Sequence, residues 1–295
     1  MKKKQVIVLL SALVCMMFAA CNSGSAPSAN APGGNSKAIL VVSFGTSYNE
    51  SRDATIGAVE AAITAAFPDY EVRRAFTSQI IIDILAEREN LEIDNVDQAM
   101  VRLIDDGVKE LIVQPTHLMS GFEYDDVVAE VNAYKDQFDK IIIGEPLLTS
   151  DSDFAGVIDV ITSETASFSN DETAIVFMGH GTEHDSNHVY SDLQAKLKNA
   201  GFPNYFIGTV EAEPTLEDVI AAVENGGYSK VVMQPLMVVA GDHANNDMAG
   251  DEEDSWKTIF EGEGFGVESV LKGLGEFPGI HKIYIQHIQD AIKQL

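Results

Sequence analysis

The sequence predicts an α/β fold of two similar lobes, each a parallel sheet flanked by helices. Short β-branched apolar runs alternate with longer segments that carry apolar residues at helical spacing, which is typical of parallel sheets covered by helices. This pattern restarts near residue 174, and residues 107–115, ending in Gln114-Pro115, match residues 227–235, ending in Gln234-Pro235. The match indicates an internal duplication, and we expect two such lobes to enclose a cleft.

In the first half, four apolar runs predict strands and the segments between them predict helices. The first helix carries Ile56, Val59 and Ile63 at helical spacing, and Pro68 closes it. The predicted strands are 38–44, 70–76, 108–113 and 140–143, and the predicted helices are 49–66, 78–89, 96–106, 124–133 and 154–163.

The second half repeats this order. The predicted strands are 174–178, 205–211, 230–237 and 264–272, and the predicted helices are 187–200, 216–225, 251–260 and 280–294. Ligands of parallel sheets bind at the carboxyl ends of the strands. The residues that directly follow each strand are therefore the first candidates for a site.

The N-terminus predicts export. Three lysines at positions 2–4 precede an apolar run, 6–19, which is the pattern of a secretory signal and is too short to span a bilayer comfortably. Small residues directly before Cys21 are similar to the cleavage site of bacterial lipoproteins. We expect lipidation of Cys21, membrane contact through that anchor, and a location in the bacterial cell envelope, facing the periplasm or on the outer surface. An uncleaved anchor or a soluble secreted protein is the alternative.

These observations predict four segments. Residues 1–20 are a lipoprotein signal peptide, and 21–37, rich in Ser, Gly, Ala, Pro and Asn, are a flexible tether. Residues 38–165 form an N-terminal α/β lobe, and 166–295 form a C-terminal α/β lobe that carries the metal site.

Composition excludes several classes of function. Acidic residues outnumber basic ones 46 to 19, for a formal net charge of −27. The chain therefore lacks the clustered Lys and Arg that neutralise phosphates, so we expect no nucleic-acid partner. Cys15 would leave with the signal and Cys21 would carry lipid, which excludes disulfides, cysteine nucleophiles and thiolate metal sites from the folded part.

Three predicted strand ends carry side chains that bind metals. His180 and His243 each follow an apolar run that ends in glycine, and Glu211 follows a third run. Imidazole with carboxylate suits a borderline divalent ion such as Co²⁺, Ni²⁺, Fe²⁺ or Zn²⁺, and three ligands leave coordination positions open for exchange. The alternative for each histidine is a core side chain. A neutral imidazole can also accept a proton, which makes His180 the candidate general base.

Other polar residues near these strand ends are weaker candidates. Glu213 would face the same side as Glu211 if the strand continues through Pro214, and its alternative is a carboxylate at a helix start. His184 and His188 follow His180 at spacings of four, but the residues around them favour a loop and a helix cap over a continuous helix.

Several motifs in combination resemble the CbiK family of anaerobic-type cobalt chelatases, relatives of the ferrochelatases that insert a divalent metal into sirohydrochlorin during corrin synthesis. They are Val-Ser-Phe-Gly-Thr-Ser at 42–47, Pro-Thr-His at 115–117, Gly-Phe-Glu-Tyr at 121–124, Gly-His-Gly-Thr at 179–182, Gly-Thr-Val-Glu at 208–211, Gln-Pro-Leu at 234–236 and Gly-Asp-His at 241–243. The resemblance runs from Lys37 onward. It implies two α/β lobes with a tetrapyrrole between them and a metal bound by His180, Glu211 and His243.

In the register of the duplication, Phe44 is the counterpart of His180 and Glu123 is the counterpart of His243. Phe44 and Glu213 are candidates for contact with the tetrapyrrole, although an aromatic side chain at a strand end more often only packs. Glu123, beside His117 at the cleft edge of the first lobe, is a candidate catalytic group that accepts a proton or helps place the metal. Candidates for a clamp on the substrate's carboxylates are Arg52, Arg73 and Arg74, for which salt bridges are the commoner role.

The resemblance implies a sirohydrochlorin cobaltochelatase that takes Co²⁺, with Fe²⁺, Ni²⁺ and Zn²⁺ as other ions that fit the same ligands. One feature departs from the family, because enzymes that build cofactors work in the cytoplasm and this chain carries an export signal. The alternative is therefore an envelope lipoprotein that binds and transfers a metal, haem or a haem-like tetrapyrrole without catalytic turnover. A homo-oligomer is left open.

Overall fold

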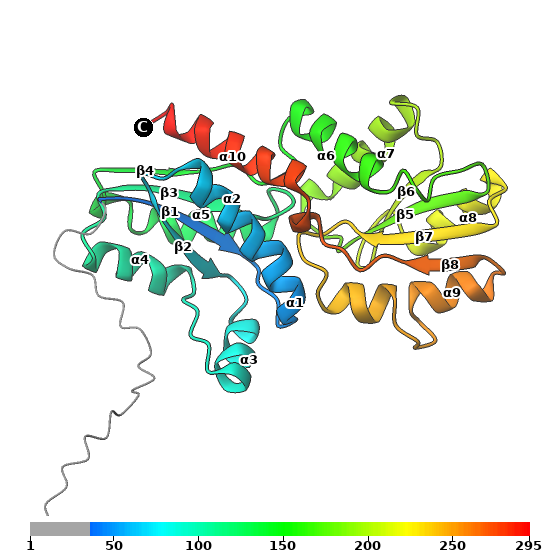
Figure 1. Ribbon diagram of the computed structural model, residues 1–295, viewed down its shortest axis with the longest axis horizontal. Coiled ribbons are helices and arrows are strands. Elements are labelled where there is room, and N and C mark those ends of the chain that lie inside the picture. Colours follow the sequence, from blue (N-terminus) through cyan, green and yellow to red (C-terminus); the bar gives the residue numbers. More distant parts are fainter. Residues whose placement is uncertain (1–35) are drawn as a thin grey trace, which may run out of the picture. The chain divides into compact units, whose positions relative to one another are not determined.

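Two four-stranded parallel sheets with the same strand order form the frame of the computed structural model, which describes residues 36–295 (Figure 1). The first sheet has the order β2-β1-β3-β4, and the second has the order β6-β5-β7-β8. The strands are β1 (Lys37–Ser43), β2 (Glu71–Phe76), β3 (Glu110–Pro115), β4 (Lys140–Ile143), β5 (Thr173–Gly179), β6 (Tyr205–Thr209), β7 (Lys230–Pro235) and β8 (Gly266–Ser269). The predicted α/β class is confirmed, and each predicted strand is present.

The register of the strands agrees with the internal duplication. Val42 of β1 lies opposite Pro115 of β3, and Met178 of β5 lies opposite Pro235 of β7. Aligning the two sheets on these pairs makes the residue two places after Val42 equivalent to the residue two places after Met178. Phe44 and His180 are therefore equivalent positions, as the sequence predicts.

The helices also follow the predicted order, with shifted ends. They are α1 (Asn49–Arg52), α2 (Ala58–Ala66), α3 (Gln79–Glu89), α4 (Val96–Asp105), α5 (Phe122–Asn132), α6 (Asp151–Glu164), α7 (His188–Asn199), α8 (Leu216–Gly226), α9 (Trp256–Gly262) and α10 (Pro278–Ile292). The predicted helix 49–66 contains a π-helical turn, η1 (Asp53–Gly57), between α1 and α2. Short helical turns also occur at η2 (Lys135–Gln137), η3 (Asp185–Asn187), η4 (Ala244–Met248) and η5 (Leu274–Glu276).

Capping residues explain two of the shifted ends. Ser150 and Asp153 form a reciprocal capping box, so α6 begins three residues before the predicted helix 154–163. The predicted start of the helix 251–260 is wrong, because the side chain of Ser255 accepts a hydrogen bond from the backbone N–H of Thr258 and starts α9 at Trp256.

Alternation along the strands divides the core between the two faces of each sheet. In β1, Ile39 and Val41 belong to one apolar cluster, and Leu40 and Val42 belong to another. The first of these clusters also contains Phe177 of β5 and the buried apolar residues of α2, α6, α7 and α10. The opposite faces are covered by α4 and α5 on the first sheet and by α8 and α9 on the second. One shared core therefore joins the two sheets.

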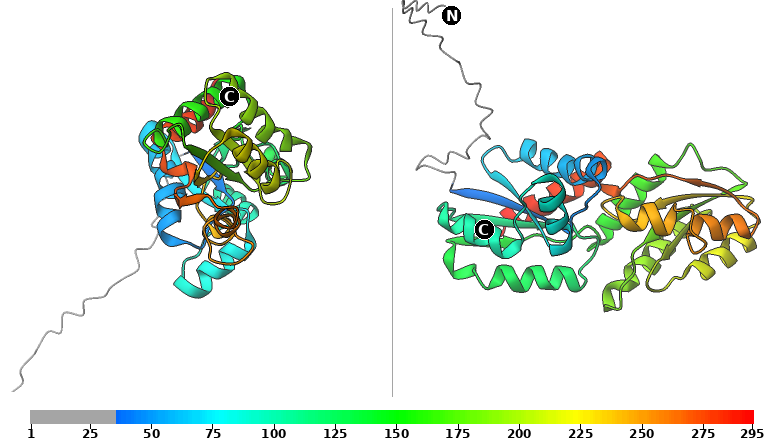
Figure 2. Two further views of the ribbon diagram at one scale, coloured as in Figure 1. Left: turned by 90° about the vertical axis from the view of Figure 1, so that its right-hand side faces the viewer. Right: turned by 90° about the horizontal axis from the view of Figure 1, so that it is seen from below.

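The last helix of each half, α6 in the first and α10 in the second, packs against the other half (Figures 1 and 2). Helix α10 follows β8 in the chain but contacts α2, β3 and β4 of the first half, and the Tyr284 hydroxyl donates to the carbonyl of Thr116 at 2.8 Å. Helix α6 contacts α7, and Thr165 just beyond it hydrogen-bonds to Tyr205 of β6 at 2.9 Å. The first sheet takes its strands from residues before the predicted boundary at 165/166, and the second takes its strands from residues after it. Helix α10, however, packs on the first half, so the predicted bounds of the two lobes stay a prediction.

The predicted signal peptide, Cys21 and the tether up to residue 35 lie outside the described residues. Lys37, predicted as the end of the tether, already belongs to β1. Among residues 36–295, none of the helices has both the length and the apolar character needed to cross a bilayer.

Candidate functional site

The three predicted metal ligands follow three adjacent strands. His180 comes directly after β5, Glu211 comes two residues after β6, and His243 lies in the segment after β7. Strand β5 lies between β6 and β7, so the chain order reverses there, and loops from such strands diverge at the carboxyl edge where ligands bind in parallel sheets. The order of the sheet therefore brings together residues that are up to 63 positions apart in the sequence.

The side chains lie close to one another. Nε2 of His180 is 3.7 Å from Oε1 of Glu211, and the rings of His180 and His243 have centroids 4.7 Å apart at an angle of 77°. Donor atoms bound to one tetrahedral ion at about 2.1 Å lie roughly 3.4 Å apart. Within residues 36–295, no group of three or more His, Cys, Asp or Glu side chains is arranged so that it could hold a metal ion. Binding of one ion by all three side chains, which are 35–57 % exposed, therefore requires them to rotate from these positions.

Each imidazole is held through its Nδ1. His180 Nδ1 lies 2.8 Å from the carbonyl oxygen of Gly181, and His243 Nδ1 lies 2.5 Å from Oδ2 of Asp247. Both partners accept hydrogen bonds, so each ring donates from Nδ1–H, and the tautomer that carries its proton there presents the Nε2 lone pair. Carboxylates and carbonyls orient metal-binding histidines in this way in many proteins. Sequence reasoning missed Asp247, although its position four residues after His243 is a detectable signal.

The loop after β5 is shaped by Gly181. Its φ of +88° and the 2.8 Å that would separate an added Cβ from the backbone nitrogen of Ala212 leave room for glycine alone. The backbone N–H of Glu211 donates to the carbonyl of His180 at 2.9 Å, which fixes the two segments side by side. Below them, the N–H of Gly181 donates to the hydroxyl of Tyr190, and burial raises the pKa of that phenol to about 12. The loop therefore rests on a neutral, buried tyrosine.

The prediction for Glu213 assumed that the strand continues through Pro214, and this assumption is wrong. Strand β6 ends at Thr209, whose N–H donates to the carbonyl of Pro214 at 2.7 Å, so the segment turns back and does not extend through Pro214. Glu213 is exposed, and Thr215 rather than Glu213 caps α8. A contact between Glu213 and the tetrapyrrole stays a prediction.

The interpretation of His184 and His188 as loop and cap residues is confirmed. The side chain of His184 accepts a hydrogen bond from the N–H of Ser186, and His188 begins α7 with an exposed ring. Nε2 of His184 also lies 3.5 Å from Asp125, and its ring meets Phe122 edge-on at 4.9 Å. These contacts place the first turns of α5 against the loop that follows His180.

The first-lobe candidates lie at the equivalent strand ends. Phe44 directly follows β1 and is 46 % exposed. Glu123 lies in the first turn of α5, half-exposed, and its Oε2 is 3.3 Å from Nε2 of the buried His117. Side chains that can accept or donate protons thus lie near the strand ends of the first sheet as well as of the second.

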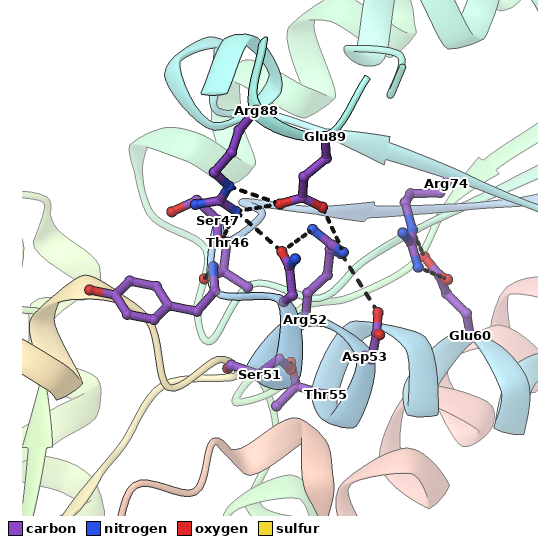
Figure 3. A network of polar contacts seen from close by, with 12 residues as sticks. Thr46, Ser47, Ser51, Arg52, Asp53, Thr55, Glu60, Arg74, Arg88 and Glu89 are labelled. Atoms are coloured by element: carbon purple, nitrogen blue, oxygen red, sulfur yellow. Dashed lines mark hydrogen bonds and ion pairs between the residues drawn. The ribbon is translucent and has the colours of Figure 1, made fainter. Parts of the chain in front are cut away.

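The arginines take structural roles, as the salt-bridge interpretation predicts. Arg52 pairs with Glu89 and Asp53, and Arg74 pairs with both oxygens of Glu60 (Figure 3). Arg73 pairs with Glu71 and Asp106.

Helix α1 and the loop before it also reach the segment of His243. The N–H of Ala240 donates to Ser51 Oγ at 3.0 Å, and the hydroxyl of Tyr48 donates to Asp242 at 3.3 Å. The His243 segment is therefore held by contacts from the first half of the chain.

Comparison with known proteins gives consistent results. The family model described as cobalt chelatase (CbiK) matches residues 37–293. The sirohydrochlorin cobaltochelatase of Salmonella typhimurium is 38 % identical over 256 residues, which cover 87 % of this chain and 96 % of that protein. The sirohydrochlorin cobaltochelatase CbiKC of Nitratidesulfovibrio vulgaris is 33 % identical over 261 residues, covering 88 % and 92 %.

Among solved structures, the sirohydrochlorin chelatase SirB from Bacillus subtilis subspecies spizizenii in complex with cobalt aligns with a TM-score of 0.60 at 12 % identity, covering 88 % of this chain and 96 % of that one. A likeness at this level of identity supports the fold of two α/β lobes.

Proposed function

The chain belongs to the cobalt chelatase (CbiK) family, and on this premise we propose that it inserts Co²⁺ into sirohydrochlorin. The observation that carries the proposal is the convergence of His180, Glu211 and His243 at three adjacent strand ends, with both Nε2 atoms presented by hydrogen bonds at Nδ1. Both named relatives act on the same substrate class, and each is covered over more than nine-tenths of its length.

The reaction exchanges two pyrrole N–H protons for one divalent ion, with no change of oxidation state. His180, Glu211 and His243 hold the ion and leave coordination positions for the ring nitrogens. As the ion passes into the ring, Nε2 of His180 is released and accepts one proton, and Glu123 accepts the other. Positioning and proton removal are the contributions of the protein, and no covalent intermediate is needed. Phe44 and Glu213 contact the tetrapyrrole in this proposal.

The proposed function is tested with purified protein, Co²⁺ and metal-free sirohydrochlorin. We expect the absorbance spectrum to shift to that of the metallated ring over many turnovers per protein. Parallel reactions with Fe²⁺, Ni²⁺ and Zn²⁺ rank the metals, because the same ligands accept all four ions. Stoichiometric uptake of haem or metal without insertion would instead indicate a carrier.

Asp247 supplies a prediction on metal affinity. Removing a partner that orients a metal-binding histidine typically lowers affinity by about 10–100-fold, so we expect Asp247→Ala to weaken Co²⁺ binding by that factor. Isothermal titration calorimetry measures the effect. The matched control is Asp251→Ala, which removes a carboxylate four residues later in the chain that is 92 % exposed and pairs with Lys257. Equal Co²⁺ affinity in the two variants would contradict the proposed role of Asp247.

We further propose that the protein is a lipoprotein of the bacterial envelope, anchored by Cys21 and working on the periplasmic or outer side. The support is the order of basic residues, apolar run and small residues before Cys21. We expect a fatty-acid analogue to label the wild type and not Cys21→Ser. In a detergent extraction, we expect Cys21→Ser to partition into the aqueous phase. Labelled Cys21→Ser protein would refute the anchor. A homo-oligomer stays a prediction, which light scattering measures.

A further inference from the structure

His117 is a buried imidazole whose hydrogen-bonding capacity is unused. Among the described residues, it is the one histidine whose ring nitrogens are buried and make no hydrogen bond. The side chain is only 8 % exposed. Buried polar atoms are almost always paired, because an unpaired donor or acceptor costs free energy when water is removed. An apolar side chain of similar size would avoid that cost, so the imidazole calls for a reason other than packing.

The nearest charged group is the carboxylate of Glu123. Nε2 of His117 lies 3.3 Å from Oε2 of Glu123, which is an ion-pair distance without hydrogen-bond alignment. The two side chains differ in freedom, because His117 is enclosed and Glu123 is 50 % exposed. The exposed Glu123 side chain is therefore the partner that is free to rotate toward alignment with Nε2–H of His117.

The backbone at His117 is fixed from two directions. The carbonyl of His117 accepts from the N–H of Leu147 at 2.9 Å, and the carbonyl of Thr116 accepts from the hydroxyl of Tyr284 at 2.8 Å. Glu123, in contrast, lies on the first turn of α5, which contacts the His184 loop of the second lobe through Phe122. A fixed donor therefore stands beside a movable carboxylate at the strand ends of the first sheet.

We propose that His117 is a positioning residue for Glu123 during metal insertion. Nε2–H of His117 donates to the carboxylate and holds one of its oxygens in place, while the other oxygen accepts a pyrrole proton. The proton moves from the ring nitrogen to Glu123 and then leaves to solvent through the exposed side of that residue. The imidazole keeps its Nε2–H throughout. This inference rests on the proposed function, since it assigns a role within that reaction.

The test compares two replacements of His117. His117→Leu removes the donor and is expected to lower kcat by about 10–100-fold, while Co²⁺ affinity stays the same and the Tm stays level or rises. His117→Gln places an amide N–H near the position of Nε2 and is expected to restore kcat to within a few-fold of the wild type. His188→Leu, at an exposed histidine, is the matched control and is expected to leave kcat unchanged. Full turnover in His117→Leu, or a loss of kcat that Gln does not restore, would overturn the inference.

A second measurement needs no turnover. The imidazole nitrogen shifts of His117, recorded by NMR, are expected to change at Nε2 in Glu123→Gln and to stay the same at Nδ1. An unchanged Nε2 shift refutes the pairing even if the protein proves inactive toward sirohydrochlorin. If the wild type failed to metallate the ring but the Nε2 chemical shift still changed in Glu123→Gln, the result would count against the proposed function alone. In the active protein, His117→Leu is also expected to have no further effect in the Glu123→Gln background, because a residue that acts through Glu123 is silent without it.

Discussion

Replacement of His243 by alanine is expected to lower the rate of Co²⁺ insertion by at least about 100-fold. Loss of a group that merely orients a metal-binding histidine costs about 10–100-fold in affinity, so loss of the ligand itself costs more. His180→Ala is expected to be more severe, because His180 is proposed both as a ligand and as a proton acceptor, and general bases contribute about 10²–10⁴-fold. Steady-state insertion rates and calorimetric Co²⁺ titrations measure both effects.

The control for these variants is His188→Ala. His188 is exposed at the start of α7 and its ring pairs with Asp192 at the surface, so its loss is expected to change neither insertion nor Co²⁺ affinity. The side chains of His180 and His243 are 45 % and 35 % exposed, and substitutions at such positions usually cost little stability. Wild-type Co²⁺ affinity in His243→Ala would rule out the proposed ligand set.

The positions of His180 and His243 could be predicted because parallel sheets follow simple rules. The duplication made equivalent strand ends visible in the sequence, and residues at the carboxyl ends of adjacent strands meet at one edge. The register places Met178 opposite Pro235, and the two imidazoles that follow these strands in the chain have ring centroids 4.7 Å apart. A local pattern was sufficient here because the sheet itself supplies the long-range contact.

Other features depend on contacts that no local pattern records. Glu213 looked equivalent to Glu211 by alternation, but the hydrogen bond from Thr209 to Pro214 ends the strand first. The unpaired state of His117 depends on which atoms enclose it, and only the folded chain defines them. The helical spacing in α10 predicts an apolar face, but the same face would fit either sheet. Its packing on α2, β3 and β4 is decided by the shape of the shared core.

That packing depends on a buried pair between α6 and α10. Nε2 of His287 lies 3.0 Å from Oδ1 of Asp153, and its Nδ1 lies 3.0 Å from the carbonyl oxygen of Glu145. The side chains of His287 and Asp153 are 8 % and 11 % exposed. Oδ2 of Asp153 also accepts from the N–H of Ser150, which caps α6. One carboxylate therefore serves both the helix start and the junction with the C-terminal helix.

We expect Asp153→Ala to lower the free energy of unfolding by about 3–5 kcal/mol. Removing one partner of a buried pair leaves the other without compensation, which typically costs this amount, and the lost half of the capping box adds to it. In a chain of this size about 1 kcal/mol shifts the Tm by roughly 2–4 °C, so thermal and urea denaturation both resolve the effect.

Asp151→Ala is the matched control for this prediction. Asp151 lies two residues earlier in α6, and its side chain is 93 % exposed and pairs with Lys196 at the surface. An exposed pair contributes little to stability, so Asp151→Ala is expected to cost far less than Asp153→Ala. The difference also tests how the halves are joined, because a destabilised junction between α6 and α10 loosens the core that both sheets share. Equal stability of the two variants would show that the His287 pair does not hold the C-terminal helix in place.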